Sequence, residues 1–339
     1  MFCSSMVRTE AKGKAIVDTI DVPLRHLVSY VLVDDVACEG SFDDALQTNT
    51  FDYVIHTASP YQLHVTDPVR DFLDPAVRGT RGLLQSVHKY APSVRRVVLT
   101  SSSAAMINPH GHAAVYNESC WRPMTWADAQ LPQNAYEASK VFSERAAWAL
   151  VNGTDDLDSA GETALLPASH TRATLFDLSV INCTYTFGPV QRWLTSLDSI
   201  NTSNHRIRDL ALGRWLKSDA GSGGMPPTRP VFTWVDVRDV AVAHVQAILV
   251  PEAGGRRFYV VGGHFSNGRL AAVARASNSE TLAKRIPPVE DTPDDMPRDV
   301  YQFDNSRSRD MLGIKRYRCL EESVMDTVDS ILDLEKCFI

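Results

Sequence analysis

The first eighty residues of this 339-residue sequence contain very little glycine. Only Gly13, Gly40 and Gly79 occur there, and no G-x-G-x-x-G or G-x-x-G-x-x-G motif lies near the N-terminus. Glycines at that spacing let backbone N–H groups approach a pyrophosphate at the start of a helix. Their absence excludes the usual glycine-rich phosphate-binding turn from this part of the sequence.

Clustered cysteines and long apolar runs are missing too. The six cysteines are scattered and form no C-x-x-C, which excludes a zinc ribbon or a disulfide framework and favours a reducing, cytoplasmic setting. No run of about 18 apolar residues is present, so we expect no transmembrane helix. The N-terminal sequence lacks the apolar core of a secretory signal, so we expect no secretion.

The sequence has no excess of positive charge. Lysine and arginine number 34 against 41 aspartate and glutamate residues, a net charge of −7, so we expect neither a nucleic acid nor a membrane as partner. His110 and His112 in one loop are too few for a metal site, and we expect no metal. The length suits one large α/β domain or a domain with a smaller lobe.

Short apolar, β-branched segments alternate with segments of helical periodicity. The predicted strands are 27–34, 52–56, 96–100 and 175–182, and the predicted helical segments are 41–46, 71–90 and 134–151. Because the strands are continuously apolar, both of their faces should be covered. The alternation therefore predicts an α/β fold, a doubly wound parallel sheet with helices on both faces.

The remaining sequence is less regular. Polar or Gly/Pro-rich stretches at 152–173 and 218–229 are predicted to be loops. Beyond about residue 201 the pattern becomes more helical, with one further strand expected at 257–261. Such a C-terminal part is typical of the substrate lobe of a two-lobed enzyme.

Tyr136 and Lys140 are spaced as Tyr-x-x-x-Lys within the predicted helix 134–151. Residues four apart share a helix face, so the ammonium of Lys140 can favour the phenolate and lower the pKa of the Tyr136 phenol. The run 100–103 (TSSS) ends a neighbouring strand, where a serine hydroxyl can hold a carbonyl oxygen while the phenol protonates it. The pair alone could be structural, but with the serine run it predicts a proton-transfer site.

Nine segments in this order resemble the extended short-chain dehydrogenases/reductases, in the branch of dihydroflavonol 4-reductase and the fungal aldehyde or methylglyoxal reductases. They are VRTEAKGK (7–14), FDYVIHTASP (51–60), RRVVLTSSSAAM (95–106), YNESCW (116–121), NAYEASKVFSERAAW (134–148), FGP (187–189), FTWVDVRDVAVAHVQAI (232–248), RFYVVGG (257–263) and DNSRSRDMLGIK (304–315). Each segment alone is weak, but the collinear set is specific to this NAD(P)-dependent epimerase/dehydratase family.

The resemblance implies catalytic roles for Ser102, Tyr136 and Lys140, with Ser101 and Ser103 as rivals for the serine. It implies NADP(H) as cofactor, with Lys140 also on the nicotinamide ribose beside Tyr136. The further implied contacts are Arg8 and Lys12 with the 2′-phosphate, Asp35 and Val36 with the adenine, Thr57 and Ala58 under the nicotinamide ribose, and Thr184 and Ser203 elsewhere on the cofactor.

The sequence departs from the family at its N-terminus. VRTEAKGK usually lies about thirty residues into a member, so the first strand, the glycine-rich turn and the first helix are expected to be missing. The resemblance thus implies a shortened, Rossmann-like dinucleotide-binding domain at 1–190. It implies a substrate lobe at 191–339, from which some segments return to the first domain. Cys183 replaces a usual proline and is expected to be an inert buried thiol.

Other polar residues are expected to be structural. Asp236, Arg238 and Asp239 resemble an ion cluster that braces the fold, and His244 resembles a packed core histidine. Aspartate, arginine and histidine can all be catalytic or ligand-binding residues, but here none of them occurs at the spacing of a known catalytic or binding motif.

Taken together, the resemblance implies an NADP(H)-dependent ketoreductase that reduces a small-molecule ketone or aldehyde to an alcohol. Fungal-type secondary metabolism, a cytoplasmic location and a monomer or homodimer are the expected setting. One alternative is a non-enzymatic or inactive relative without the glycine-rich loop. Another is a sugar-nucleotide epimerase or dehydratase. A third is that an upstream exon encodes the missing strand and turn.

Overall fold

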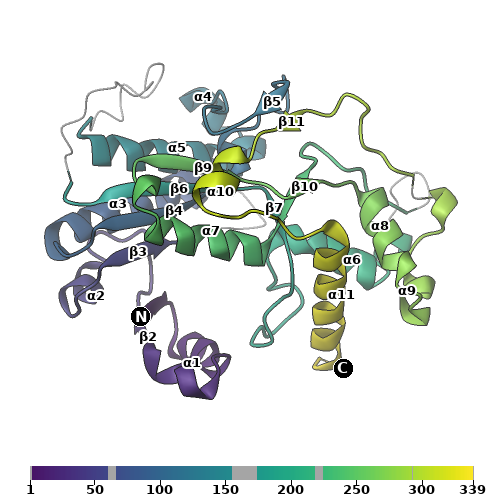
Figure 1. The fold of residues 1–339 in the computed structure, drawn as a ribbon, viewed down its shortest axis with the longest axis horizontal. Helices are drawn as coiled ribbons and strands as arrows, with labels where there is room; N and C mark the ends of the chain where they lie inside the picture. The colour runs from purple at the N-terminus through teal and green to yellow at the C-terminus, as the bar shows by residue number, and fades with distance from the viewer. Residues whose placement is uncertain (1, 60–65, 155–173, 218–223, 292, 339) are drawn as a thin grey trace. The chain divides into compact units, whose positions relative to one another are not determined.

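The computed structural model describes residues 2–59, 66–154, 174–217, 224–291 and 293–338 (Figure 1). The chain forms two compact units. The first comprises Met1–Asn108, Glu118–Asn182 and His244–Phe258, and the second Pro109–Asn117, Cys183–Ala243 and Tyr259–Ile339. Each unit therefore gathers segments that lie far apart in the sequence, and α7 (Val237–Leu249) contributes to both.

The first unit is built on a four-stranded sheet. Its strands follow the order β3 (Tyr53–His56), β4 (Arg96–Ser102), β6 (Asp177–Cys183) and β9 (Arg256–Val260), and β3 pairs with β4 in parallel. Strands predicted at 52–56, 96–100, 175–182 and 257–261 are thereby confirmed. Non-consecutive neighbours in this order require crossovers, as in a doubly wound α/β fold.

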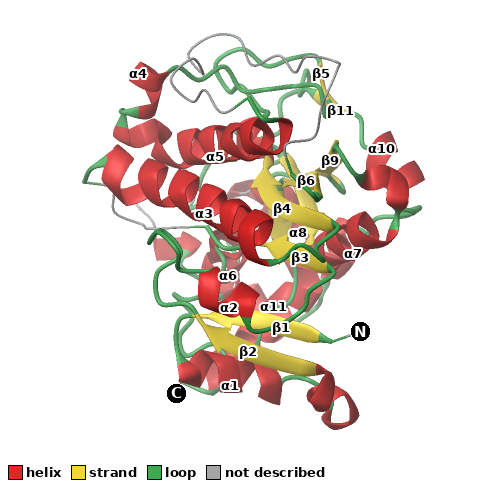
Figure 2. Ribbon diagram, turned by 90° about the vertical axis from the view of Figure 1, so that its left-hand side faces the viewer, coloured by secondary structure: helices red, strands yellow, loops and turns green. Residues whose placement is uncertain are grey.

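A second, two-stranded sheet lies nearer the N-terminus. β1 (Cys3–Val7) and β2 (Val28–Leu32) pair in parallel, with Cys3 opposite Val28, and α1 (Glu10–Asp18) connects them. Figure 2 shows this pair apart from the larger sheet. Within the described residues no strand joins β1 to β3.

Two long helices cover one face of the larger sheet. α3 (Asp74–Tyr90) and α5 (Ala135–Asn152) lie side by side (Figure 1) and pack apolar residues on the strands. Their shared core includes Leu84 of α3, Trp148 of α5, and Val97 and Leu99 of β4. Val97 and Leu99 are two residues apart, so odd-numbered side chains of β4 face these helices.

The helix predicted over 71–90 starts differently from the expectation. A π-helical turn, η2 (Val69–Leu73), precedes α3. The Asp71 carboxylate there accepts hydrogen bonds from the backbone N–H groups of Thr66 and Asp67, at 2.9 and 3.0 Å. These contacts satisfy N–H donors that the start of a helix leaves unpaired.

The short elements of the chain complete both units. The first unit holds α2 (Asp43–Gln47) and α4 (Trp126–Ala129), and the second holds β5 (Val115–Tyr116), β7 (Tyr185–Phe187), β8 (Thr233–Asp236), β10 (Gly263–His264), β11 (Gln302–Phe303), α6 (His205–Ala211), α8 (Asn267–Ala276), α9 (Glu280–Arg285), α10 (Ser306–Met311) and α11 (Leu320–Lys336). The 3-10 turns are η1 (Val22–Leu27), η3 (Ser103–Ala105), η4 (Pro132–Asn134), η5 (Thr202–Asn204), η6 (Trp215–Lys217), η7 (Pro251–Ala253) and η8 (Val289–Asp291).

The second unit has its own aromatic core. β8 lies between β7, which is parallel to it, and β10, which is antiparallel. Phe187 stacks on Trp234 with ring centroids 6.0 Å apart and meets Phe265 edge-on at 5.1 Å. Helices α6, α8 and α11 enclose this cluster. The unit therefore buries enough apolar surface to form a separate core.

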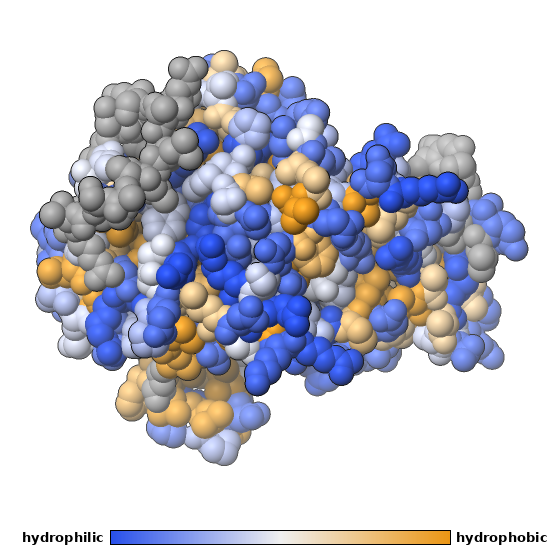
Figure 3. Space-filling model, turned by 45° about the horizontal axis from the view of Figure 1, so that its top comes forward, coloured by the Kyte–Doolittle hydropathy of each residue, from blue (hydrophilic) through white to orange (hydrophobic). Residues whose placement is uncertain are grey.

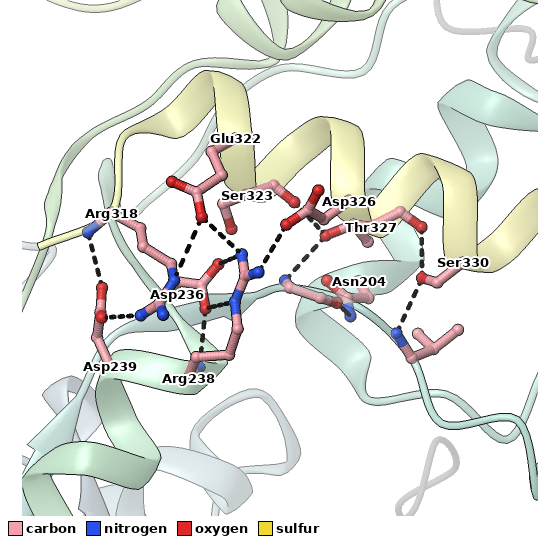
Figure 4. Close-up of polar contacts among 12 residues, drawn as sticks. Asn204, Asp236, Arg238, Asp239, Arg318, Glu322, Ser323, Asp326, Thr327 and Ser330 are labelled. Carbon is pink, nitrogen blue, oxygen red and sulfur yellow. Dashed lines mark hydrogen bonds and ion pairs between the residues drawn. The ribbon is translucent and has the colours of Figure 1, made fainter.

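An ion-pair network fastens α11 to the start of α7 (Figure 4). The guanidinium of Arg238 donates to the buried Asp236 carboxylate at 2.8 and 2.9 Å and to Asp326 at 2.6 Å. Asp239 pairs with Arg318. Burial alone would raise the pKa of Asp236, but hydrogen bonds from Arg238 outweigh it and lower the pKa. The bracing role expected for this cluster agrees with these contacts.

The face drawn in Figure 3 is largely hydrophilic, with apolar residues in small groups. Among the described residues, no helix combines the length and the apolar character needed to cross a bilayer. The predicted loops at 152–173 and 218–229 fall mostly outside the described residues.

We expect Gly188→Ala to destabilise the protein by about 2–4 kcal/mol. Gly188 has a φ of 134°, and an added Cβ would lie 2.5 Å from Cγ1 of Val237. Its N–H also donates to the Thr327 hydroxyl at 2.9 Å, so the backbone has little freedom to move away. Urea denaturation measures the change.

Gly82→Ala is the matched control. Gly82 lies within α3, and a Cβ there would meet nothing within 4 Å, so this variant should gain about 0.5–1 kcal/mol from reduced backbone entropy. Equal stability of the two variants would contradict the strained conformation of Gly188.

Candidate functional site

The serine run ends β4 in three different environments. Ser101, on the face that looks toward α5, donates its hydroxyl to Oε2 of Glu144 at 2.6 Å. Ser102 accepts the N–H of Ala104 at 3.1 Å and caps the short turn η3, which leaves its O–H proton as a donor. Ser103 is buried. Of the three, Ser102 combines partial exposure with a free donor.

Tyr136 and Lys140 lie in the first two turns of α5, as the sequence predicts. The Nζ of Lys140 is 5.7 Å from the centroid of the Tyr136 ring. It also donates to Oγ of Ser59 at 2.8 Å. Lys140 is only 9% exposed. Water therefore screens its positive charge only weakly, and the electrostatic effect of that charge on the Tyr136 phenol is strong. The positive end of the helix dipole at Ala135 acts in the same direction.

His56 is a site residue that the sequence reasoning missed. It is the last residue of β3, is buried, and meets Phe42 edge-on at 6.3 Å. Burial, reinforced by the charge of Lys140, lowers the pKa of His56 to about 4. The imidazole of His56 is therefore neutral at neutral pH, and Lys140 is the positively charged partner of this pair. A buried polar residue ending an apolar strand was the available signal.

His244 on α7 is packed as expected. It is buried, and its Nε2 lies 2.7 Å from Oγ1 of Thr100 on the even-numbered face of β4. This contact pairs both polar groups inside the first unit and supports a structural role.

Glu144 is the second residue missed from the sequence. It is fully buried on α5, one turn beyond Lys140. Its carboxylate pairs with Nε of Arg257 at 2.7 Å and accepts hydrogen bonds from Ser101 and from Asn182. The signal was an acidic residue continuing the spacing of Tyr136 and Lys140.

The residues predicted to meet a cofactor follow the carboxyl ends of strands. Arg8 follows β1 and is exposed, and Lys12 is exposed in the first turn of α1. Thr57 and Ala58 follow β3 and are exposed. Ligands of doubly wound sheets bind at this edge. The placement therefore permits the predicted contacts.

Asp35 and Val36 lie in the turn after β2. The Asp35 carboxylate accepts the N–H of Ala37 at 2.9 Å and the thiol of Cys38 at 3.5 Å, and that bond raises the pKa of the Cys38 thiol. Val36 packs against the core that contains Leu84. The turn is thus held by its own contacts, with the Asp35 side chain exposed.

Thr184 and Ser203 belong to the second unit. The hydroxyl of Thr184 is buried and donates to the carbonyl oxygen of Thr233 at 2.7 Å. Ser203 accepts the N–H of Thr186 at 3.1 Å. Both hydroxyls thus make contacts inside their own unit.

Cysteine and metal chemistry find little support in the described part of the chain. None of the six cysteines forms a disulfide, and Cys183 is half-buried instead of fully buried as expected. No cluster of three metal-ligating side chains occurs among the described residues. His112 stacks on Tyr301 with ring centroids 4.6 Å apart.

The sequence has characterised relatives. A family model described as the NAD dependent epimerase/dehydratase family matches residues 18–161. The chain is 47% identical to Ketoreductase azaE of Aspergillus niger over 328 residues, which cover 96% of this chain and 89% of the relative. It is 34% identical to the NADPH-dependent methylglyoxal reductase GRE2 of Saccharomyces cerevisiae, over 91% of this chain and 84% of that protein.

Solved structures agree with the sequence relatives. Yeast methylglyoxal/isovaleraldehyde reductase Gre2 complexed with NADPH superposes with a TM-score of 0.80 at 30% identity, covering 98% of this chain and 92% of that one. Vestitone reductase from alfalfa superposes with a TM-score of 0.67 at 15% identity, covering 99% and 91%. The latter likeness shows the fold alone.

We expect the free energy of unfolding to fall below neutral pH, partly through His56. Its pKa is about 4 when folded against 6.5 when exposed, so the unfolded chain takes up the proton first. The stability contributed by the neutral side chain is present above pH 6.5 and disappears as the pH approaches 4. At pH 5 it should have fallen by about 2 kcal/mol.

Urea denaturation at pH 7 and pH 5 measures this loss in the wild type and in His56→Gln. The variant should show the smaller difference between the two pH values, and His26→Gln, at an exposed position, controls for the substitution itself. The same pH dependence in wild type and His56→Gln would contradict a neutral, buried His56.

Proposed function

Since this chain belongs to the NAD-dependent epimerase/dehydratase family, we propose that it is an NADP(H)-dependent reductase that converts a ketone or aldehyde to an alcohol. The observation that carries the proposal is the pairing of Tyr136 with Lys140 on α5, in the same unit as the Ser102 end of β4. The 47% identity to a named ketoreductase supports the same reaction class.

NADPH, when bound, would supply the hydride that the carbonyl carbon accepts in the proposed reaction. Ser102 donates a hydrogen bond to the carbonyl oxygen, and Tyr136 transfers its phenolic proton to the oxygen as negative charge develops there. Lys140 stabilises the phenolate that remains. The proton that Tyr136 gives to the oxygen thus balances the hydride at carbon, and the product is the neutral alcohol.

The choice of Ser102 over its neighbours rests on hydrogen bonding. Ser101 gives its proton to Glu144 at 2.6 Å, so it cannot give the same proton to a substrate. Ser103 is buried at 5% exposure. Ser102 uses its oxygen as an acceptor for Ala104 and keeps its proton for the carbonyl.

The residues present fit the adenosine end of NADP(H) better than its pyrophosphate. Arg8 and Lys12 are exposed cations beside the N-terminal turn of α1, where a 2′-phosphate would find charge-assisted partners. The first eighty residues contain no G-x-G-x-x-G or G-x-x-G-x-x-G motif that would bind the pyrophosphate. We propose that Asp35, Val36, Thr57, Ala58, Thr184 and Ser203 contribute the other contacts.

One alternative has an observation of its own. The β1–β2 pair is separate from the larger sheet, which favours a non-enzymatic relative that retains the catalytic residues without holding the cofactor. A sugar-nucleotide epimerase or dehydratase is less favoured, because the named relatives are reductases. NADPH turnover with a simple ketone separates the three.

The cellular setting is part of the same proposal. Six free cysteines suit a reducing cytoplasm, and the likeness to a fungal ketoreductase suggests a step in secondary metabolism. We propose a monomer or homodimer that acts on a small-molecule carbonyl compound.

We expect Tyr136→Phe to lower the turnover number by a factor of about 10² or more. The variant keeps the ring beside Lys140 but removes the proton donor. Initial rates of NADPH oxidation with a ketone substrate measure the effect. Tyr53→Phe is the control, because Tyr53 is a half-buried tyrosine of the same unit whose ring stacks on Arg95 at 4.7 Å. Near-normal turnover in Tyr136→Phe would reject the mechanism.

We expect the preference for NADPH over NADH to reside at Arg8 and Lys12. Replacing both with alanine removes two charge-assisted hydrogen bonds to the 2′-phosphate and none to a 2′-hydroxyl. Because both side chains are exposed, preference should move toward NADH by less than the about 1.5–3 kcal/mol that a charge-assisted hydrogen bond contributes in a less exposed site. The ratio of kcat/KM for the two cofactors measures it.

Lys14→Ala is the matched control for this pair. Lys14 lies on the same helix and pairs with Glu10 at 3.5 Å, so its replacement should leave the ratio unchanged. An unchanged ratio in Arg8→Ala/Lys12→Ala would mean that these two charges are merely solvated.

A further inference from the structure

The carboxylate of Glu144 connects one helix to three adjacent strands. Ser101 of β4 and Asn182 of β6 donate to Oε2 at 2.6 and 2.8 Å. Arg257 of β9 donates from Nε to Oε1 at 2.7 Å. Because β4, β6 and β9 are consecutive in the sheet, one side chain on α5 makes hydrogen bonds to three neighbouring strands.

The partner of this carboxylate is itself firmly held. Nη1 of Arg257 donates to the carbonyl oxygens of Glu118 and Cys120 at 2.7 and 2.8 Å. Its guanidinium lies 3.9 Å from the ring centroid of Trp121. Glu144 and Arg257 are 0% and 6% exposed. A buried ion pair whose arginine also has these backbone and aromatic contacts has little room to shift.

The same contacts reach both halves of the proposed reductase site. Glu144 follows Lys140 and Tyr136 at intervals of four residues, so the three side chains share one face of α5. Ser101 precedes Ser102 on β4, and Asn182 donates to the backbone carbonyl of Ser102 at 3.4 Å. The carboxylate therefore lies between the proton-donating helix and the carbonyl-binding strand end.

We propose that Glu144, held by Arg257, is a positioning residue for this reaction. It fixes the separation between the Ser102 end of β4 and the face of α5 that carries Tyr136 and Lys140. The inference rests on the proposed reductase function. Glu144 touches neither the substrate nor the cofactor in this role, and it acts through Ser101, Asn182 and the helix itself.

A second buried ion pair allows this role to be separated from stability. Arg96 pairs with Asp177 at 2.5 and 3.0 Å, and its other donors meet the carbonyl oxygens of Ala247, Val250 and Pro251. Arg96 begins β4 and Asp177 begins β6. The pair thus joins the same two strands about 20 Å from Ser102 along β4.

The experiment compares Glu144→Gln with Asp177→Asn. Each neutralises one carboxylate of a buried pair and leaves the arginine its backbone acceptors, so both should lower the melting temperature. Glu144→Gln should also lower kcat about 10- to 100-fold while changing KM for NADPH and ketone by less than about 3-fold, because misplacement affects the reacting geometry more than binding. Asp177→Asn should keep kcat within about 3-fold of wild type.

Equal losses of kcat in the two variants, or a kcat unchanged in Glu144→Gln, would overturn the proposal. Failure of the proposed function gives a different result, namely a wild-type rate that Tyr136→Phe does not lower.

Ser101 provides a second test if Glu144→Gln does not fold. Ser101→Ala removes a single hydrogen bond beside Ser102 and should lower kcat about 3- to 10-fold. Ser101→Thr keeps the hydroxyl for Glu144 and should restore most of the wild-type kcat. Wild-type kcat in Ser101→Ala, or the same low kcat in both serine variants, would contradict positioning through this contact.

Discussion

The first unit depends on a charge that has been removed from water. An unpaired carboxylate inside a protein is strongly destabilising, so Glu144 requires Arg257 and the neutral donors Ser101, Asn182 and Trp148 around it. That requirement fixes where α5 can lie on the sheet, because Arg257, Ser101 and Asn182 come from three strands. Tyr136 and Lys140, the residues of the proposed proton transfer, are carried on the same helix, so the electrostatic constraint also determines their place.

The second unit also contains a buried carboxylate paired with an arginine, but this ion pair lies nearer to the solvent. Asp236 is fully buried, but its partner Arg238 also reaches the half-exposed Asp326 on α11 (Figure 4). Burial raises the pKa of Asp239, and contacts with Arg318 act against that rise. Pairs of this kind fix the ends of helices more than they add free energy. Both units thus use arginine forks where helices meet strand ends.

The sequence predicts the central strands and the helix that carries Tyr136 and Lys140, because their signals are local. Continuous apolar residues mark 96–100 and 175–182, and the Tyr-x-x-x-Lys spacing marks 134–151. β1 escapes notice because CSSMV has a weak β pattern, and the π-helical turn before α3 depends on the contacts of Asp71. The Glu144–Arg257 pair joins residues 113 positions apart, a separation at which helical or strand periodicity carries no information.

The separate β1–β2 pair has a consequence for how the protein behaves at high concentration. In the described residues, β1 and β3 each have one side that pairs with no strand. Ile55 of β3 is 41% exposed, and neither CSSMV nor YVIH contains a proline or lysine that would discourage pairing. The unpaired N–H and C=O groups on these strand edges can form hydrogen bonds with a strand of a second chain. We therefore expect these strand edges to favour association between chains at high protein concentration.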